Sequence, residues 1–274
     1  MSSSRTPGGA RLRGLREANG KTQLAVELEA GIGTGYLQRV ESGRVAQPER
    51  ATLERLLSAL GARYSEQRDV LELFGYLTPA PLPTLQDLAW ARDVSRRELD
   101  EVALPAYVLD CRHRLAAWNR QVPHIFGINP ADPSLGGLAG ESILAAWFDP
   151  ESPLFQIIAE PDSFLPAMIR AFRSEMQLFH YEVWYPPLIE ELRRLPAFRF
   201  WWEVVEQEPA VASAARALVP LGIATPEAGQ LRFRLSSEHF VRDARFRIVY
   251  LFPADPTTMR QCAGWAAETI AIAR

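Results

Sequence analysis

Two short helix-forming segments separated by glycines, within residues 21–43, are the feature that most limits how this chain can fold. Thr22 can cap a helix over Gln23–Glu29, a tight turn is expected at residues 30–33, and a further helix is expected over Thr34–Glu41. Gly31 occupies a position where a short turn requires a positive φ. The side chains expected to hold the two helices together are Val26, Ile32, Leu37 and Val40. The pattern therefore predicts two packed helices, with the first residues of the second one exposed.

Three flanking segments complete a small helical domain. Helices are expected over Ala10–Ala18, Glu49–Leu60 and Ser65–Phe74, and the middle one has leucines at helical spacing. Residues 1–9 are polar and rich in Gly and Ser, so they are expected to form a disordered tail. An all-α domain of five helices is thus predicted over residues 10–78.

The charge of the chain is unevenly distributed. Residues 1–64 contain ten Lys or Arg and six Asp or Glu, a net +4, whereas the whole chain carries −3, which leaves −7 for the remainder. A basic module attached to an acidic body is the distribution expected when the first module binds a polyanion. A charge of +4 is modest, so it supports this prediction without establishing it.

The residues from Lys21 to Gly43, KTQLAVELEAGIGTGYLQRVESG, resemble the XRE (lambda-repressor-like) helix-turn-helix family. The resemblance extends over residues 11–60 and includes Gln23, the turn glycine Gly31 and the exit Val-Glu-Ser-Gly43. It implies a DNA-binding domain and a transcription regulator. The family usually has a small residue at the position of Glu27 and a Ser or Thr cap at the position of Gly33. Thr34 is expected to take over as the cap.

The resemblance also implies which residues face DNA. Thr34, Gly35, Gln38 and Arg39 fall at or beside the base-facing positions, and Arg39 can give two hydrogen bonds to a guanine. Gln23, Lys21 and Arg44 are expected to contact phosphate, which positions the protein without specifying sequence. The full predicted DNA-binding set is Lys21, Thr22, Gln23, Thr34, Gly35, Tyr36, Gln38, Arg39 and Arg44. One helix-turn-helix covers only a half-site, so a homodimer on a double-stranded operator is expected. The alternative is that these are exposed polar residues of a small helical domain.

A second domain is predicted after a proline-rich linker. Leu77–Pro83 contains three prolines and Leu85–Val102 has the pattern of a connecting helix, so residues 79–103 are expected to join two domains. Beyond them the apolar pattern predicts four strands, a short helix, a helical region rich in aromatics over residues 141–208, and a final helix. The strands are expected at Ala106–Asp110, Arg114–Trp118, Gln230–Phe240 and Arg245–Phe252, the short helix at Arg120–Phe126 and the final helix at Thr257–Ala273. The chain is therefore predicted to be α+β, with the second domain over residues 104–274.

The second domain resembles the ligand-binding domain of MmyB-like regulators, which is PAS-like. The resemblance rests on PAYVLDCRHRLAAWN from Pro105 to Asn119, on Phe126-Gly127, on Phe148-Asp-Pro150, on Leu195-Pro-Ala-Phe198 and on Pro226-Glu-Ala-Gly-Gln-Leu231. A His-Pro pair common in the family is Thr225-Pro226 here. The resemblance implies an antiparallel sheet with helices that enclose an apolar pocket, and a fatty acid as the bound ligand.

Aromatic and methionine side chains are the expected lining of this pocket. Phe164, Met168, Phe172, Met176 and Phe179 form one stripe of a helix, and Met and aromatic residues suit an adaptable apolar cavity. The predicted ligand-binding set is Trp118, Phe126, Phe148, Phe164, Met168, Phe172, Met176, Phe179, Trp184, Phe198, Trp201 and Trp202. A carboxylate head would need a cation, for which Arg170, Arg173 and Arg199 are candidates. The alternative is that the stripe is ordinary core.

The remaining chemistry of the sequence argues against an enzyme. The four histidines are scattered without metal-ligand spacing, and the two cysteines, Cys111 and Cys262, form neither a metal motif nor a disulfide framework. We therefore expect no catalytic residue, no metal and no cofactor beyond a possible bound fatty acid. No apolar run is long enough to span a membrane and the first ten residues are not a signal peptide, so the cytoplasm is expected. Two alternatives remain: a second domain that only dimerises or binds another protein, and a haem or flavin sensor.

Overall fold

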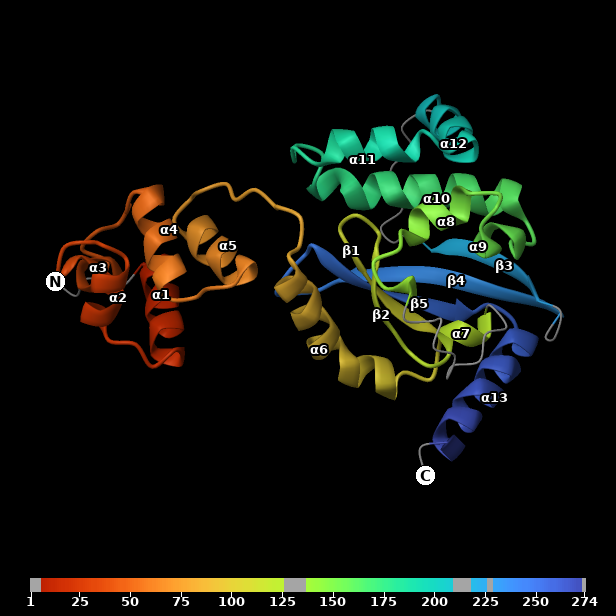
Figure 1. Ribbon diagram of the computed structural model, residues 1–274, viewed down its shortest axis with the longest axis horizontal. Coiled ribbons are helices and arrows are strands. Elements are labelled where there is room, and N and C mark those ends of the chain that lie inside the picture. Colours follow the sequence, from red (N-terminus) through yellow and green to blue (C-terminus); the bar gives the residue numbers. More distant parts are fainter. Residues whose placement is uncertain (1–5, 126–136, 209–217, 226–228, 273–274) are drawn as a thin grey trace. The chain divides into compact units, whose positions relative to one another are not determined.

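The computed structural model describes residues 6–125, 137–208, 218–225 and 229–272 (Figure 1). The chain divides into two compact units, Met1–Pro79 and Ala80–Arg274. Unit 1 is entirely helical in its described part, and unit 2 combines helices with an antiparallel sheet. The α+β class expected from the sequence is confirmed.

Unit 1 consists of five helices around one core. They are α1 (Pro7–Ala18), α2 (Gln23–Glu29), α3 (Tyr36–Glu41), α4 (Arg50–Ala59) and α5 (Tyr64–Leu73). The core is built mainly from leucines and valines of all five helices, and it includes the four side chains expected to hold α2 and α3 together, with Ile32 at its edge. Gly31 has a φ of 63°, as the turn between these helices requires.

Helix α1 begins earlier than the sequence suggested. Thr6 accepts a hydrogen bond from the amide of Gly9 at 3.2 Å, and Pro7 takes the first helical position, so the cap and the proline together start the helix here. A Cβ atom on Gly8 would meet the ring of Phe74 at 2.6 Å. The assignment of residues 7–9 to a disordered tail is therefore wrong, because these residues are helical and packed.

Unit 2 places its helices on both faces of a five-stranded sheet. Its strands are β1 (Ala106–Asp110), β2 (Leu115–Trp118), β3 (Val219–Thr225), β4 (Gly229–His239) and β5 (Phe246–Pro253). Its helices are α6 (Leu85–Glu101), α7 (Val122–Ile125), α8 (Ile143–Phe148), α9 (Pro153–Gln156), α10 (Pro161–Glu175), the 3-10 turn η2 (Met176–Leu178), α11 (Tyr185–Leu192), α12 (Pro196–Glu206) and α13 (Pro256–Ile272). All strand pairs are antiparallel in the order β2-β1-β5-β4-β3, which confirms the sheet expected of a PAS-like domain.

The two faces of this sheet have different coverings. Helices α8, α10, α11 and α12 lie on one face, which we call the inner face, and α6 and α13 lie on the other (Figure 1). Because side chains alternate along a strand, Tyr107 of β1 and Arg247 of β5 face inward, whereas Val108 and Ile248 pack against α6. The inner face thus carries both apolar and charged side chains beneath α10.

Strand β3 was not expected from the sequence. It contains Pro220 and Gly222, two residues that disfavour strands, and it lies at the edge of the sheet, where a proline is tolerated. The amide of Ala159 donates to the carbonyl of Gly222 at 2.9 Å, and a Cβ on that glycine would lie 3.3 Å from the Cβ of Ala159. The glycine therefore allows residues 157–159 to cover the edge of the sheet.

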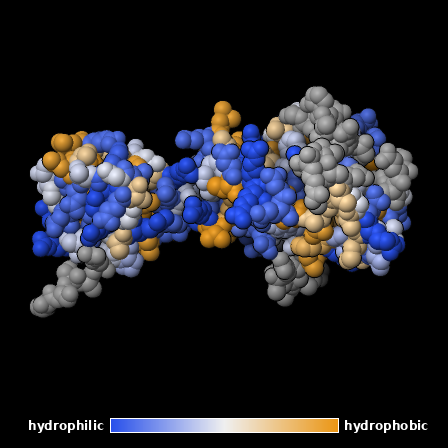
Figure 2. All heavy atoms as spheres, turned by 90° about the horizontal axis from the view of Figure 1, so that it is seen from below, coloured by the Kyte–Doolittle hydropathy of each residue, from blue (hydrophilic) through white to orange (hydrophobic). Residues whose placement is uncertain are grey.

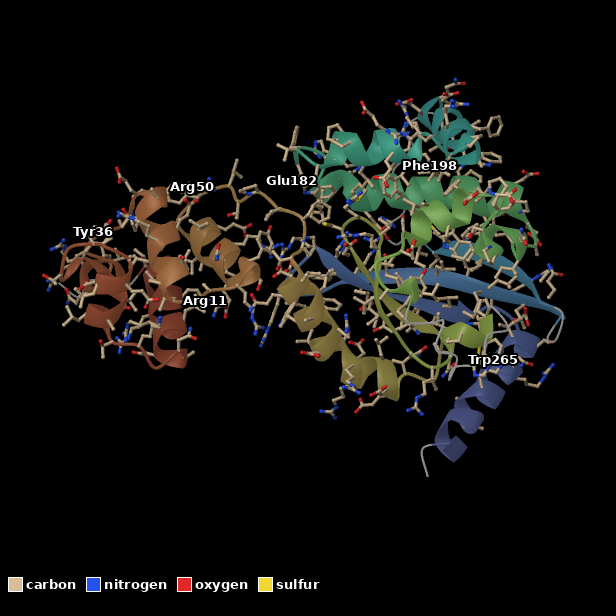
Figure 3. All side chains as sticks on the ribbon, viewed as in Figure 1. Arg11, Tyr36, Arg50, Glu182, Phe198 and Trp265 are labelled. Atoms are coloured by element: carbon tan, nitrogen blue, oxygen red, sulfur yellow. The ribbon has the colours of Figure 1, made fainter. Side chains whose placement is uncertain are left out.

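The beginning of unit 2 is fixed to its own helices and sheet. Ala80 donates its amide to Glu182 and accepts a hydrogen bond from the indole of Trp184, both at 2.7 Å (Figure 3 labels Glu182). The buried guanidinium of Arg245 pairs with Asp243 at 2.8 Å and with Asp87 at 3.3 Å, and it donates to the carbonyl of Pro81. The proline-rich segment is thus held by unit 2 from Ala80 onward, rather than being a free linker up to α6.

Seen from the side of α6 and α13, hydrophobic residues form separate groups among hydrophilic ones (Figure 2). Within the described ranges, no helix is both long and apolar enough to cross a membrane.

Candidate functional site: the helix-turn-helix surface and an apolar cavity

A buried glutamate joins the two helices of the helix-turn-helix. The side chain of Glu27 in α2 is 2% exposed, and its two carboxylate oxygens accept hydrogen bonds from the amides of Gly35 at 2.9 Å and Leu37 at 2.7 Å. These amides belong to the first turn of α3, where backbone donors have no partner within the helix and a negative charge is favoured. Glu27 therefore caps α3 from the preceding helix.

This capping corrects the expected start of the second helix. Helix α3 begins at Tyr36 rather than Thr34, and its cap residue is Gly35, with a φ of 79°. Thr34 does not act as the cap, because the carboxylate of Glu27 supplies the acceptor that the missing Ser or Thr would have provided. The glycine permits the left-handed backbone at this position.

A second buried carboxylate connects the end of α3 to α1 and α2 through hydrogen bonds. Glu41, 3% exposed, accepts hydrogen bonds from Arg16 at 2.7 and 3.1 Å and from the amide nitrogen of Gln23 at 2.7 Å. The side-chain bond to Glu41 is the main reason that the pKa of Arg16 is raised. Gln23, one of the predicted phosphate contacts, is thus held in place at the start of α2.

The other predicted DNA contacts divide into exposed and engaged residues. The exposed ones are Thr22, Thr34, Gly35, Gln38, Arg39 and Arg44. Tyr36 is half-buried at the start of α3, and the guanidinium of Arg39 lies 5.7 Å from the centre of its ring (Figure 3 labels Tyr36). Lys21 is engaged, because its ammonium group donates to Glu29 and to the carbonyl of Ala59. The structure therefore brings Gln38 and Arg39 to the surface of α3.

Unit 2 contains a cavity of about 630 Å³ on the inner face of the sheet, here called the large cavity. Its walls come from β1, β2 and β5 and from the short helices α7, α8 and α9, and they are mostly aliphatic or aromatic. Among the lining side chains are Tyr107, Leu115, Trp118, Ile125, Ala146, Trp147, Leu154 and Leu251. A cavity of this volume with apolar walls and few polar groups is typical of small-molecule sites.

The predicted aromatic stripe stands behind the cavity wall instead of forming it. Of the twelve predicted ligand contacts, Trp118 lines the large cavity, Met168 lines a smaller hollow described below, and Phe126 falls outside the described residues. Nine line neither space: Phe148, Phe164, Phe172, Met176, Phe179, Trp184, Phe198, Trp201 and Trp202. Seven of these nine are buried and pack with one another or with neighbouring helices, as ordinary core does; Trp184 and Trp201 are half-buried.

Aromatic contacts explain why this region is closed. The ring of Phe198 packs at 5.2 Å from that of Phe148 and at 5.5 Å from that of Trp202, between α8, α10 and α12 (Figure 3 labels Phe198). The predicted cationic anchors lie outside the cavity as well. Arg170 is paired with Glu208, Arg173 lies over the ring of Trp202, and Arg199 is exposed.

A buried polar cluster that the sequence did not reveal lies beneath α10. Arg247 of β5, 2% exposed, donates to Nδ1 of His113 at 2.6 Å and forms an ion pair with Glu175 at 3.3 Å. Glu175 also accepts a hydrogen bond from the hydroxyl of Ser237. These side chains line one part of a space of about 40 Å³, here called the small hollow, whose other walls are mostly apolar and include Tyr107.

Burial controls the protonation of this region. It lowers the pKa of His113 well below its ordinary value, with a further contribution from the positive charge of Arg247, so the imidazole is neutral. Burial likewise raises the pKa of the hydroxyl of Tyr107, and it raises the pKa of the Cys111 thiol to about 12. A thiol with that pKa stays protonated, which argues against a redox role for Cys111. No group of three or more metal-ligating side chains occurs among residues the structure describes.

Comparisons with known proteins agree with this division. A family model for a helix-turn-helix domain matches residues 9–71, and the model for the MmyB-like transcription regulator ligand binding domain matches residues 91–263. A helix-turn-helix domain joined to a ligand-binding domain defines a DNA-binding transcription regulator. The chain belongs to the family of MmyB-like transcription regulators.

The chain has low similarity to individual known proteins. No curated protein matches the chain. A solved structure described as "Structure of an RNA-binding Light-Oxygen-Voltage Receptor" aligns with 98% of this chain at 12% identity and a TM-score of 0.29. The alignment covers 65% of that receptor chain, so this protein spans less than two thirds of its length.

Proposed function

We propose that the protein is a cytoplasmic regulator of XRE type that binds operator DNA as a homodimer through α3. In this proposal unit 2 binds an apolar small molecule, a fatty acid, and ligand binding changes the affinity for DNA. The large cavity is the observation that carries the proposal, because about 630 Å³ of apolar space is costly for a domain that has no ligand to enclose. It also argues against the alternative in which unit 2 only dimerises or binds another protein.

The exposed residues of α3 support the DNA part of the proposal. Arg39 and Gln38 have the side chains that read base edges in a major groove, and the ring of Tyr36 supports the guanidinium of Arg39. Gly35 lets the start of α3 approach a groove closely, and the exposed Arg44 can contact phosphate. Helix α3 has six residues, so one copy reads only a short half-site and a symmetric pair is expected to bind the operator.

The DNA proposal is tested with DNA fragments that the wild-type chain selects from a random pool. Replacement of Arg39 by alanine removes a bidentate base contact and is expected to weaken binding roughly tenfold to a hundredfold. Arg13→Ala is the matched control, because Arg13 is a half-buried arginine of α1 rather than α3, where it pairs with Glu17. Unchanged affinity of Arg39→Ala, with an intact circular dichroism spectrum, would contradict the proposed interface.

The ligand proposal is tested on delipidated full-length protein with a series of saturated acids from octanoic to stearic acid. Binding is expected to raise the unfolding temperature of unit 2, by the equivalent of about 2.7 kcal/mol at a ligand concentration of 100 Kd. The tryptophans all lie beyond residue 80, so their fluorescence reports unit 2 alone. Ala146→Phe, which fills the large cavity from α8, is expected to abolish the shift, and Ala263→Phe on an exposed position of α13 is the matched control.

Modulation requires that the ligand bind the DNA-competent and incompetent states with different affinities. DNA affinity is therefore measured with and without the tightest acid of the series, and native mass spectrometry of the same samples reports the oligomeric state. A dimer whose DNA affinity changes with ligand in the wild type, and not in Ala146→Phe, supports the proposal. Equal DNA affinity in both conditions rules out modulation but leaves ligand binding intact.

A further inference from the structure

The large cavity and the small hollow share a wall. Tyr107, Ile143 and Trp147 line both spaces, so the polar cluster around Arg247 lies next to the mostly apolar large cavity, across these three side chains. Such an arrangement suits an amphiphile, with a tail in the larger space and a head group in the smaller one.

Most of the hydrogen-bonding capacity left over around the small hollow consists of donors; the buried hydroxyl of Ser236, which can donate or accept, is also without a partner among the described residues. Arg247 forms its hydrogen bond and its ion pair through Nη2, and its Nε and Nη1 donate to no residue in the part of the chain that the structure describes. Because Nδ1 of His113 accepts from Arg247, the neutral ring carries its proton on Nε2. That buried nitrogen has no hydrogen-bond partner among the described residues, and lies 3.7 Å from Glu175.

Two further donors belong to the shared wall. The indole nitrogen of Trp147 is buried without a hydrogen-bond partner, and the hydroxyl of Tyr107 forms no hydrogen bond to any described residue. Both oxygens of Glu175 are already engaged, one by Ser237 and the other by Arg247. Buried donors without partners are unfavourable, so the cluster is suited to a ligand group that accepts several hydrogen bonds.

The size of the small hollow limits this group. A volume of about 40 Å³ is small beside the about 630 Å³ of the large cavity, so it admits a group of a few atoms and excludes a bulky head. We propose that Arg247, Tyr107 and His113 bind the free carboxylate of a long-chain acid whose tail fills the large cavity. This inference rests on the proposed function of that cavity, and it selects the free acid over esters, thioesters and phospholipids.

The net charge of the cluster determines how it can distinguish one head group from another. Glu175 already neutralises Arg247, and His113 is neutral, so the site does not attract every anion through an excess charge. The ligand is instead selected through several donors that converge on one acceptor group. An alcohol or a methyl ester with the same tail can accept fewer of these hydrogen bonds, and is expected to bind more weakly.

The test compares three probes with one tail, namely myristic acid, methyl myristate and myristyl alcohol, by calorimetric titration of the full chain. The acid is expected to bind at least tenfold more tightly than the other two. Tyr107→Phe removes one unpartnered hydroxyl and is expected to reduce this preference roughly tenfold, whereas Tyr185→Phe, outside both spaces, leaves it unchanged.

A second variant removes the charged pair without leaving either partner alone. Arg247→Gln combined with Glu175→Gln is expected to abolish the preference for the acid while the ester still binds. If this variant does not fold, Tyr107→Phe alone decides the question. Equal affinity of the wild type for all three probes would overturn the head-group site and leave the apolar cavity as a ligand site. If the wild type binds none of the three probes, both proposals are overturned. If Ala146→Phe binds none of the probes that the wild type binds, their tails occupy the large cavity.

Discussion

Both units bury charged side chains, and the hydrogen bonds of Glu27 and Glu41 in unit 1 are more completely satisfied than those of the cluster around Arg247 in unit 2. In unit 1, both carboxylate oxygens of Glu27 accept backbone amides, and Glu41 accepts three hydrogen bonds from Arg16 and Gln23. In unit 2, Arg247, His113 and Glu175 contact one another, but the Nε2 of His113 has no partner in the described part of the chain.

We interpret this difference as the distinction between a structural cluster in unit 1 and the proposed binding cluster in unit 2. A buried charge costs several kcal/mol unless its hydrogen bonds are met, so a satisfied cluster stabilises one arrangement of helices. Donors that are buried without a partner have lost their hydrogen bonds to water and gained none in the protein. A ligand that accepts hydrogen bonds from them offsets this cost, which favours its binding. Substitutions in unit 1 are therefore expected to change stability, and substitutions at the unpartnered donors of unit 2 to change binding.

The largest effect is expected where the satisfied cluster is broken. Glu27→Ala leaves the amide of Gly35 and the buried amide of Leu37 without their acceptor and is expected to destabilise unit 1 by about 3 kcal/mol. Far-ultraviolet circular dichroism in denaturant measures the loss, and tryptophan fluorescence is expected to show unit 2 unchanged. Glu29→Ala is the control on the same helix, because Glu29 is exposed and its pair with Lys21 contributes little. Equal stability of the two variants would show that Glu27 does not fix α3.

The folding of unit 1 followed largely from its sequence, because its signals are local. Helical spacing of apolar residues, the cap at Thr22 and the turn glycine Gly31 placed α2 within its observed bounds. The cap of α3 could not be predicted in the same way. A glutamate in α2 reads as a departure from the family pattern, and only the packing of the two helices shows that its carboxylate reaches the amides of the next helix.

The lining of the large cavity was predicted less well, for a physical reason. Periodicity shows that Phe164, Phe172 and their neighbours share one helical face, but it does not show what that face meets, and here it meets α8 and α12. One signal for Arg247 was available: an arginine between Phe246 and Ile248 in a strand with apolar residues on both faces must be buried with a partner. No local feature distinguished His113 from the arginines on either side of it.

A second effect, of intermediate size, comes from the neutral histidines beneath α10. Burial lowers the pKa values of His113 and His239, whose neighbours are Arg247 and Glu175, so below pH 6.5 the unfolded chain binds protons that the folded chain does not. The stability of unit 2 is therefore complete above pH 6.5 and falls as the pH drops further, by at most about 1.4 kcal/mol per pH unit for each histidine. Tryptophan-monitored unfolding from pH 7.5 to 5 measures this slope, and His113→Gln is expected to make it shallower. If the slope is the same in that variant, uptake of a proton by His113 on unfolding does not contribute to the pH dependence.

The smallest effect is expected at Tyr107, and it is the sharpest test of the distinction between the clusters. Removal of a buried hydroxyl that forms a hydrogen bond costs about 1 kcal/mol or more of stability. The hydroxyl of Tyr107 forms no hydrogen bond to any described residue. The ligand-free Tyr107→Phe variant is therefore expected to keep its stability within about 0.5 kcal/mol. Denaturant unfolding followed by tryptophan fluorescence measures this. Myristic acid is then expected to stabilise the wild type more than the variant, because the hydroxyl gains its partner only in the complex. A variant that is already destabilised without ligand would mean that the hydroxyl serves the fold, and the clusters of the two units would then not differ in kind.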